Sequence, residues 1–220
     1  MSPLYVSMMV GMIATILIVV TGILLHGVLK VYMYRGRSLI DSVITLPLVL
    51  PPVVMGFFIL MIFSPANAFG AWLDSYGIRI VFTKMAAILA SAIVAFPLFY
   101  QSLKGGLEMV DPVVEDVART LGASEWRIYW TISLPLAKKA LVSGGILAFC
   151  RALGEFGATI LVAGNIPGVT RTLPLAIYTA VESGNYGEAL DYVVIISALT
   201  ICLLWVVHGY GNIFGKKGRN

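Results

Sequence analysis

Long apolar runs separated by short polar segments dominate the chain. Since about 20 apolar residues in a helix cross the hydrocarbon core of a bilayer, five runs are predicted to span a membrane: Leu4–Leu29, Val43–Phe63, Met85–Leu103, Ala140–Gly164 and Tyr192–Phe214. A sixth run, Leu173–Val181, is too short to cross alone and is predicted to be a re-entrant or surface-lying helix. The pattern predicts an all-α polytopic membrane protein with one transmembrane domain over residues 1–220.

Composition agrees with this pattern, because 59 % of the residues are hydrophobic and 12 % are charged, whereas about a quarter are charged in soluble domains. The net charge of +4 does not indicate nucleic acid binding, since the cations are scattered over short loops. Three cations, Arg79, Lys84 and Arg171, fall on one predicted side of the membrane. Eleven fall on the other: Lys30, Arg35, Arg37, Lys104, Arg119, Arg127, Lys138, Lys139, Lys216, Lys217 and Arg219. The positive-inside rule therefore predicts a multi-pass protein of the cell (inner) membrane with its N-terminus outside and its C-terminus in the cytoplasm.

Prolines interrupt two of the predicted spans. The second span contains Pro47, Pro51 and Pro52, and the third contains Pro97. Proline removes a helical hydrogen bond, so both helices are expected to be kinked. Three prolines within six residues exceed the general enrichment of proline in membrane helices. They favour a functional bend beside a translocation path, at Pro47 and Pro51.

The longest polar stretch, about residues 105–137, is predicted to form two short helices. Asp111, followed by proline, is typical of a helix start, and Gly122 is typical of its C-terminal end. Ser124 is predicted to cap a second helix, Glu125–Thr131, which ends before a proline. The segment is therefore expected to be an ordered helical hairpin.

Two interpretations of this hairpin are open from its residues alone. Trp126, Tyr129 and Trp130 suit an amphipathic helix at the level of the lipid headgroups. Charges of both signs beside an apolar stripe instead suit docking into a groove of another protein. These charges belong to Glu115, Asp116, Arg119, Glu125 and Arg127.

Residues 115–124 read Glu-Asp-Val-Ala-Arg-Thr-Leu-Gly-Ala-Ser, and Ile-Ser-Leu-Pro follows at 132–135. This spacing resembles the EAA motif of ABC importer permeases, although Glu-Asp-Val replaces Glu-Ala-Ala. The resemblance implies a type I ABC importer permease-like fold, in which the motif forms a coupling helix seated in a cleft of a separate cytoplasmic ATPase. The residues expected to couple to the ATPase are Glu115, Asp116, Ala118, Arg119, Leu121, Gly122, Ala123, Ser124 and Trp126.

Further segments are similar to the oxyanion branch of this family. Residues 41–52, with Thr-Leu-Pro-Leu-Val-Leu-Pro-Pro, resemble the second span of molybdate, tungstate and sulfate permeases. Gly-Glu-Phe-Gly-Ala-Thr at 154–159, with residues 164–168 and 170–174, is similar to the molybdate branch in particular. The resemblance covers about residues 38–214. It implies import of molybdate or tungstate by alternating access.

The resemblance also implies partners: a second copy in a homodimer, two copies of the ATPase, an extracytoplasmic oxyanion-binding protein and membrane lipid. ATP and Mg²⁺ would bind the ATPase. The sequence has no GxxxxGK[ST] motif and no metal-ligand spacing, so the chain is not expected to be an enzyme or to hold a metal or cofactor. A sulfate-type oxyanion permease, an ion-coupled secondary transporter and a membrane assembly factor are the alternatives.

Two charged sites accompany these segments. Arg151 and Glu155 lie four residues apart within a predicted span, on a stripe that continues to Thr159, and both charges should face protein or water. They form either a packing pair or a site where Arg151 meets a passing oxyanion. Arg171 and Thr172 are expected on the outer face, either to dock a binding protein or to contact the anion.

Overall fold

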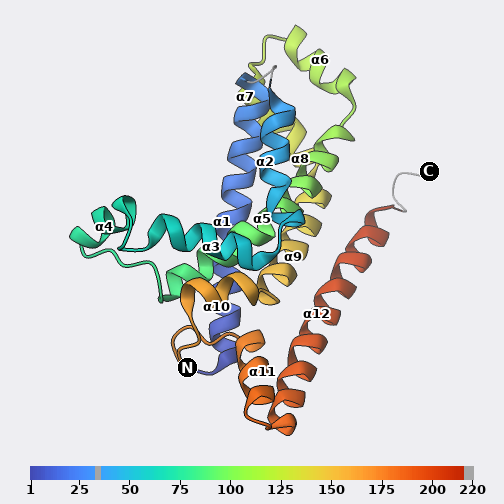
Figure 1. Ribbon diagram of the computed structural model, residues 1–220. Coiled ribbons are helices and arrows are strands. Elements are labelled where there is room, and N and C mark those ends of the chain that lie inside the picture. Colours follow the sequence, from blue (N-terminus) through green and yellow to red (C-terminus); the bar gives the residue numbers. More distant parts are fainter. Residues whose placement is uncertain (33–35, 216–220) are drawn as a thin grey trace.

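The computed structural model describes residues 1–32 and 36–215. Arg35, Lys216, Lys217 and Arg219, which contribute to the predicted charge bias, lie outside the described residues. The described chain is helical, with short connections (Figure 1). Its helices are α1 Pro3–Tyr32, α2 Arg37–Val49, α3 Pro52–Phe63, α4 Ala68–Ser75, α5 Lys84–Glu108, α6 Pro112–Thr120, α7 Glu125–Ile128, a π-helix Tyr129–Ser133, α8 Leu134–Leu136, α9 Lys138–Leu153, α10 Gly157–Ala163, α11 Leu173–Glu182 and α12 Tyr186–Gly215.

The helices α1, α5 and α12 are the three in the described chain that are long and apolar enough to cross a membrane. Two bent pairs also qualify when each pair is taken as one span: α2 with α3, and Glu125–Leu136 with α9. The count then rises to five, which agrees with the predicted number, although the second pair begins at Glu125 in the predicted hairpin and not at Ala140. The short helix α11 lies at the end of the molecule opposite α6 (Figure 1).

The second predicted span is broken at its prolines. The helix α2 ends at Val49, α3 begins at Pro52, and the two axes differ by 112°. Pro51 and Pro52 lack the amide N–H groups that would continue the helix, and proline is well suited to a first helical turn. The predicted bend is confirmed here. In the third span, α5 runs through Pro97 as one helix.

The fourth predicted span, Ala140–Gly164, is not one helix. The structure places α9 before a break at 154–156 and α10 after it. The apolar pattern continues across this break, which is why hydropathy did not reveal it. The carboxylate of Glu155 stabilises the break by accepting a hydrogen bond from the amide of Ala158, in the first turn of α10, at 2.8 Å.

Small residues bring the central helices close together. Ala14 on α1, Ala90 on α5 and Ala148 on α9 are fully buried in one core cluster. On α1, Gly22 faces the ring of Phe99, and an added Cβ would lie 2.7 Å from that ring. Small residues allow close helix approach in membrane proteins, so this core fixes α1, α5 and α9 against one another.

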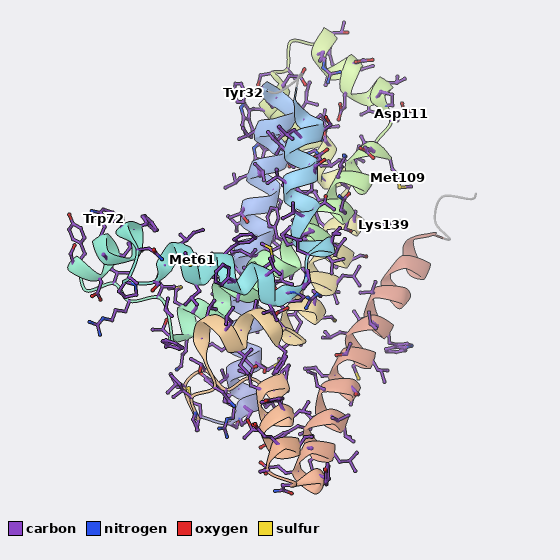
Figure 2. The ribbon with its side chains drawn as sticks, in the orientation of Figure 1. Tyr32, Met61, Trp72, Met109, Asp111 and Lys139 are labelled. Carbon is purple, nitrogen blue, oxygen red and sulfur yellow. The ribbon has the colours of Figure 1, made fainter. Side chains whose placement is uncertain are left out.

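Two parts of the molecule extend away from this core. The α3–α4 segment projects sideways, and Met61 and Trp72 lie along it (Figure 2). The helix α12 starts beside α11, contacts α9 and runs back toward the hairpin end (Figure 1). In its most apolar window, none of α12 is buried. Both parts therefore offer large apolar surfaces to lipid or to another chain.

Candidate functional site

The hairpin formed by residues 111–136 lies at one end of the bundle (Figure 1). Asp111 caps α6 by accepting a hydrogen bond from the amide of Val113 at 2.9 Å, and Ser124 caps α7 by accepting one from the amide of Arg127 at 3.3 Å. The two-helix prediction and both caps are confirmed. The second helix is longer than predicted, because it continues through the π-helix and ends at Leu136.

Proline does not end this second helix, for a local reason. The amide of Leu134 donates to the carbonyl of Tyr129, which is the wider hydrogen bond of a π-helix. Pro135, which has no N–H to donate, then falls in the first turn of α8. The wider turn thus carries the helix past the proline.

Gly122 makes the turn between the two hairpin helices. Its φ of +84° lies in the left-handed region, which residues with a Cβ enter at a cost of about 1–2 kcal/mol. The amide of Gly122 donates to Arg119 at 2.9 Å and that of Ala123 donates to Ala118 at 3.0 Å. This pair of bonds is a Schellman motif, and it satisfies carbonyls at the end of α6.

An apolar stripe on α6 faces away from the molecule. Val113, Val117 and Leu121 follow one another at four-residue spacing and are 62 %, 55 % and 82 % exposed. Residues four apart lie on one helix face. The hairpin therefore presents a continuous apolar face at the end of the bundle, of the kind that a groove in another protein can cover.

The opposite face of α6 is held by a buried carboxylate. Glu115 accepts hydrogen bonds from the ammonium of Lys30 on α1 at 2.5 Å and from the hydroxyl of Ser133 at 2.6 Å. Lys30 also donates to Ser133 at 3.2 Å. Burial alone would raise the pKa of the Glu115 carboxyl, but these hydrogen bonds, with the charges of Lys30 and Arg119, hold that pKa below its ordinary value.

Arg119 joins the two hairpin helices on the solvent side. Its guanidinium donates to Asp116 at 2.6 Å on α6, and to both carboxylate oxygens of Glu125 on α7, at 2.5 and 3.0 Å. A further contact reaches Glu115 at 3.4 Å. The hydrogen bond from Arg119 is the main cause that lowers the pKa of Glu125. This network fixes the angle between the helices.

The structure divides the nine predicted coupling residues. Glu115 and Ala118 are buried and point inward, so neither offers its side chain to an outside partner. Glu115 was predicted to couple to the ATPase, and in this structure its side chain is buried against Lys30 and Ser133. Five of the nine are exposed and two are half-buried: Asp116, Arg119, Leu121, Gly122 and Ser124, then Ala123 and Trp126. The most exposed apolar stripe also includes Val113 and Val117, which the predicted set left out.

The predicted pathway residues lie in and beside the breaks of two helices. Pro47 is inside α2 and Pro51 lies at its junction with α3. Glu155 is paired with Arg151 at 2.9 Å, with the Glu155 side chain 1 % exposed and that of Arg151 30 % exposed. The Thr159 hydroxyl is buried and has no hydrogen-bond partner among the described residues. Only Arg151 of this group keeps a partly accessible charge.

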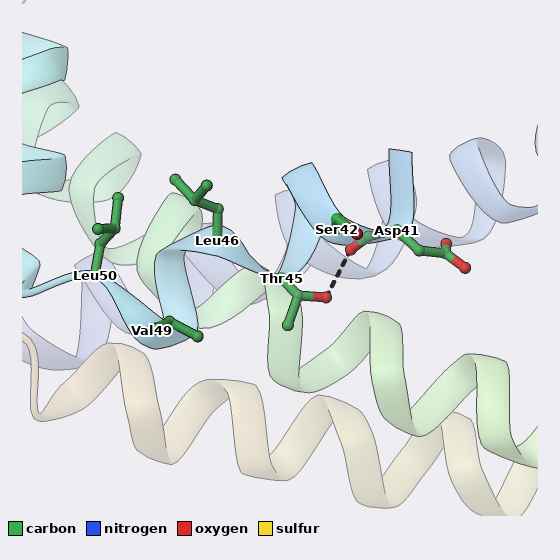
Figure 3. A pocket seen from close by; sticks show the side chains of 6 residues that line it. All are labelled: Asp41, Ser42, Thr45, Leu46, Val49 and Leu50. Carbon is green, nitrogen blue, oxygen red and sulfur yellow. Dashed lines mark hydrogen bonds between the residues drawn. The ribbon is translucent and has the colours of Figure 1, made fainter. Parts of the chain in front are cut away.

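Sequence reasoning missed a polar attachment of α2, in which no residue is buried. Asp41 accepts hydrogen bonds from the hydroxyl of Tyr100 at 2.7 Å and from the ammonium of Lys104 at 2.6 Å, both on α5. Nearby, Arg37 and the buried His26 of α1 are 2.9 Å apart. An open groove along α2 is lined by Asp41, Ser42, Thr45, Leu46, Val49 and Leu50 (Figure 3). The available signal was a carboxylate just before the second predicted span and a lysine just after the third.

The two residues predicted for the outer face differ in exposure. Arg171 is half-buried and its Nε donates to the amide oxygen of Asn165 at 2.8 Å. Thr172 is only 4 % exposed, at the start of α11. The burial of Thr172 favours a structural role over contact with a docked protein. Arg171 is therefore the residue of the pair that a partner can reach.

Comparison with known proteins identifies relatives over almost the whole chain. The sequence is 42 % identical over 207 residues to a putative molybdenum transport system permease protein of Bacillus subtilis, covering 94 % of this chain and 91 % of that protein. It is 42 % identical over 201 residues to the molybdenum transport system permease protein of Escherichia coli, covering 90 % and 88 %. The sulfate transport system permease protein CysT of Escherichia coli is 32 % identical over 212 residues, covering 96 % and 76 %.

Solved structures share the fold at low sequence identity. A subunit of a bacterial alginate ABC transporter, solved in complex with a periplasmic protein, matches with a TM-score of 0.74 at 15 % identity, over 96 % of this chain and 77 % of that one. A subunit of an amino acid ABC transporter matches with a TM-score of 0.60 at 19 % identity, over 98 % and 92 %. The model of one protein family, the binding-protein-dependent transport system inner membrane component, matches residues 18–210. The chain therefore belongs to this family of ABC importer permeases, as the motifs of its sequence predicted.

Proposed function

We propose that the chain is the membrane-spanning permease subunit of an ATP-driven importer of molybdate. Two copies would form the path, with two copies of a separate ATPase and an extracytoplasmic binding protein. The observation that carries the proposal is the exposed stripe of Val113, Val117 and Leu121 on a hairpin that is tied to α1. The two relatives named for molybdenum transport, at 42 % identity, support the substrate. Tungstate has the same charge and shape as molybdate, so we expect both anions to be carried.

In this proposal the hairpin seats its apolar stripe in the ATPase. Closure of the ATPase dimer around ATP brings the two hairpins of the homodimer together, and the attached helices turn to change the side on which the path is open. ATP hydrolysis takes place on the ATPase, whereas this chain supplies the translocation path and the hairpin that transmits the movement. The hairpin end is then cytoplasmic, in line with the cations Lys30, Arg37 and Lys104 at that end.

Reconstitution tests the function. The permease, its ATPase and its binding protein are placed in vesicles, and ATP hydrolysis and anion uptake are measured with molybdate, tungstate and sulfate. We expect molybdate and tungstate to stimulate hydrolysis and to accumulate. Stimulation by sulfate alone would indicate a sulfate-type permease. Uptake driven by an ion gradient with the ATPase absent would indicate a secondary transporter, and a complete complex that moves no anion would indicate an assembly factor.

The hairpin contact has a direct binding test. Leu121→Asp places a charge on the apolar stripe, so we expect the ATPase no longer to co-purify with the permease. Ile78→Asp is the matched control, because Ile78 is also exposed, at 51 %, but lies outside the hairpin. Retention of the ATPase by Leu121→Asp would contradict the proposed docking face.

A further inference from the structure

The hairpin is attached to α1 through a closed triangle of polar groups. Lys30, Glu115 and Ser133, which come from α1, α6 and the π-helix, lie within hydrogen-bond distance of one another at 2.5, 2.6 and 3.2 Å. We call this triangle the α1 clamp. All three side chains are largely shielded, since Ser133 is 0 % exposed and the side chains of Lys30 and Glu115 are 20 % and 12 % exposed. Ion pairs shielded in this way are screened little by salt.

A second set of contacts secures the same end of α1. The hydroxyl of Tyr129 donates to the backbone carbonyl of Ile23 at 2.8 Å. The Tyr129 ring lies over Gly27, where an added Cβ would be 2.7 Å from the ring. Two residues beyond Lys30 on α1, the hydroxyl of Tyr32 accepts a hydrogen bond from the indole of Trp126 at 3.1 Å. The π-helix supplies both Tyr129 and Ser133, so this irregular turn provides two residues that form hydrogen bonds with α1.

The chemistry of the clamp suits a role in fixing the position of the hairpin relative to α1 better than a role in stabilising the fold by packing. A shielded carboxylate loses hydration, and well-packed apolar residues often give equal or greater stability at such a position. A charged triangle instead sets the direction and distance of each partner. Arg119, by contrast, ties the hairpin helices to each other and makes no hydrogen bond or ion pair with α1 in the described structure. Among the described residues, the clamp therefore supplies the ion pair that joins the hairpin to α1.

We propose that α1 and the hairpin move as one rigid body during transport, and that Lys30 is the positioning residue that carries hairpin movement into α1. This inference rests on the proposed function and deepens it, because it names the spanning helix that receives the movement first. The hairpin continues covalently into α9 through a 73° bend. The clamp adds a second route, through α1, that the chain connectivity does not provide.

Neutral variants of the clamp test the role of its charge. Lys30→Met and Glu115→Gln keep the approximate size of each side chain and remove the ion pair. We expect the ATPase to remain bound and active, while the molybdate imported per ATP hydrolysed falls at least about fivefold, as is typical for loss of an energetic coupling between sites. Lys30→Arg should restore most of this ratio. A purely structural role would lower the amount of folded complex and leave the ratio unchanged.

Glu108→Gln is the matched control, because this exposed carboxylate ends α5 near the hairpin but lies outside the clamp. It should keep the wild-type ratio. If Lys30→Met and Glu115→Gln both keep that ratio too, the inference is wrong. The wild-type complex separates this result from failure of the proposed function, since a wild type without molybdate-stimulated hydrolysis would contradict the function itself.

A second test restores the link between α1 and the hairpin with a covalent bond in place of the clamp. In a background with Cys150→Ser and Cys202→Ser, Lys30→Cys and Glu115→Cys are combined and joined with a short bis-methanethiosulfonate reagent. The unlinked double variant should import little molybdate per ATP hydrolysed. Linking should restore this ratio, because a covalent bond within a rigid body does not hinder its movement. Linking that blocks transport would overturn the inference, since α1 and the hairpin would then have to separate during the cycle. Glu115→Cys alone, treated with the same reagent, controls for modification.

Discussion

Glu155, two residues after α9 ends, accepts a hydrogen bond from the amide of Ala158 in the first turn of α10 at 2.8 Å. Its other carboxylate oxygen receives the guanidinium of Arg151 at 2.9 Å. Both oxygens are thus engaged inside the protein, and the side chain is 1 % exposed. Of the two interpretations that the sequence left open, this geometry favours a packing pair for Glu155. Arg151, at 30 % exposure, is the member of the pair that an anion can still approach.

Substitutions at Glu155 should separate its two contacts. Glu155→Gln keeps an oxygen for the Ala158 amide and loses only the charge, whereas Glu155→Ala loses both. A buried amide left without an acceptor costs about 1–3 kcal/mol, so we expect Glu155→Ala to unfold at a clearly lower temperature than Glu155→Gln. Thermal unfolding in detergent measures the difference. Equal unfolding temperatures would show that the hydrogen bond to Ala158 does not stabilise the break.

The crossing of α3 and α10 should tolerate no added methyl group at Gly56. A Cβ there would lie 2.8 Å from the backbone Cα of Ala158, and backbone cannot move aside as a side chain can. We expect Gly56→Ala to lower the free energy of unfolding by about 1–3 kcal/mol, as overpacking does. Gly145→Ala is the matched control, because the nearest atom to its added Cβ is 3.8 Å away. Denaturation of the two variants in detergent, followed by helical circular dichroism, compares them directly.

The backbone conformation at Gly122, and not the space around it, limits which residues can replace this glycine. An added Cβ would meet nothing within 4 Å, but φ is +84°. Asparagine enters this region more readily than other residues, so Gly122→Asn should keep most of the ATPase binding and transport. Gly122→Val should lose both while still inserting into the membrane. Gly122→Asp adds a charge beside the apolar stripe and should abolish transport. Normal uptake by Gly122→Val would contradict the need for this turn.

Local signals in the sequence predicted the hairpin well. Asp111, Ser124 and Gly122 each act within a few residues, so their roles as caps and turn were predictable and are confirmed. The break at Glu155 was not predictable from hydropathy, because apolar residues continue on both sides of it. Its signal was the pair of glycines that flank the carboxylate, at 154 and 157.

Which face of α6 is buried could not be predicted from its sequence. The valines of α6 follow a helical stripe that is usual for a buried face, yet Val113 and Val117 are exposed and Glu115 is buried. The reason is long-range. Lys30 lies 85 residues before Glu115 in the chain, and only the tertiary structure brings its charge to the carboxylate. The π-helix that supplies Ser133 likewise has no simple sequence signature.

Acidification should release the hairpin from α1 through Glu115. Because its folded-state pKa is below its ordinary value, protonation is linked to loosening of the hairpin. The stabilisation is complete above the unfolded pKa, and it is lost as the pH falls through the lowered folded pKa. We expect hydrogen exchange of the hairpin amides to show unchanged protection from pH 7 to about pH 5 and a loss of protection in more acidic solution. Glu115→Gln should have lower protection throughout and should lack most of this acid dependence.

Arg171 is predicted to contact the docked binding protein, and not the transported anion. Its guanidinium is held in place by Asn165, whose own amide nitrogen donates to Thr179 at 2.7 Å, so the cation is positioned on a fixed loop. Acidic residues surround this end of the molecule, with Glu182 and Glu188 both exposed, and they disfavour a resident anion. A docked protein with a carboxylate opposite Arg171 would instead gain a charge-assisted hydrogen bond.

The two roles of Arg171 predict different titrations. For docking, Arg171→Gln should raise the concentration of binding protein that gives half-maximal ATP hydrolysis by about tenfold or more, since loss of a hydrogen bond to a charged group costs about 1.5–3 kcal/mol. The dependence on molybdate at saturating binding protein should then stay unchanged. For anion contact, the molybdate dependence should shift instead. Arg79→Gln, which removes an exposed cation paired with Asp74 on the same predicted side, should move neither curve. A shift in the molybdate curve alone would therefore assign Arg171 to the translocation path, where the anion itself meets the guanidinium.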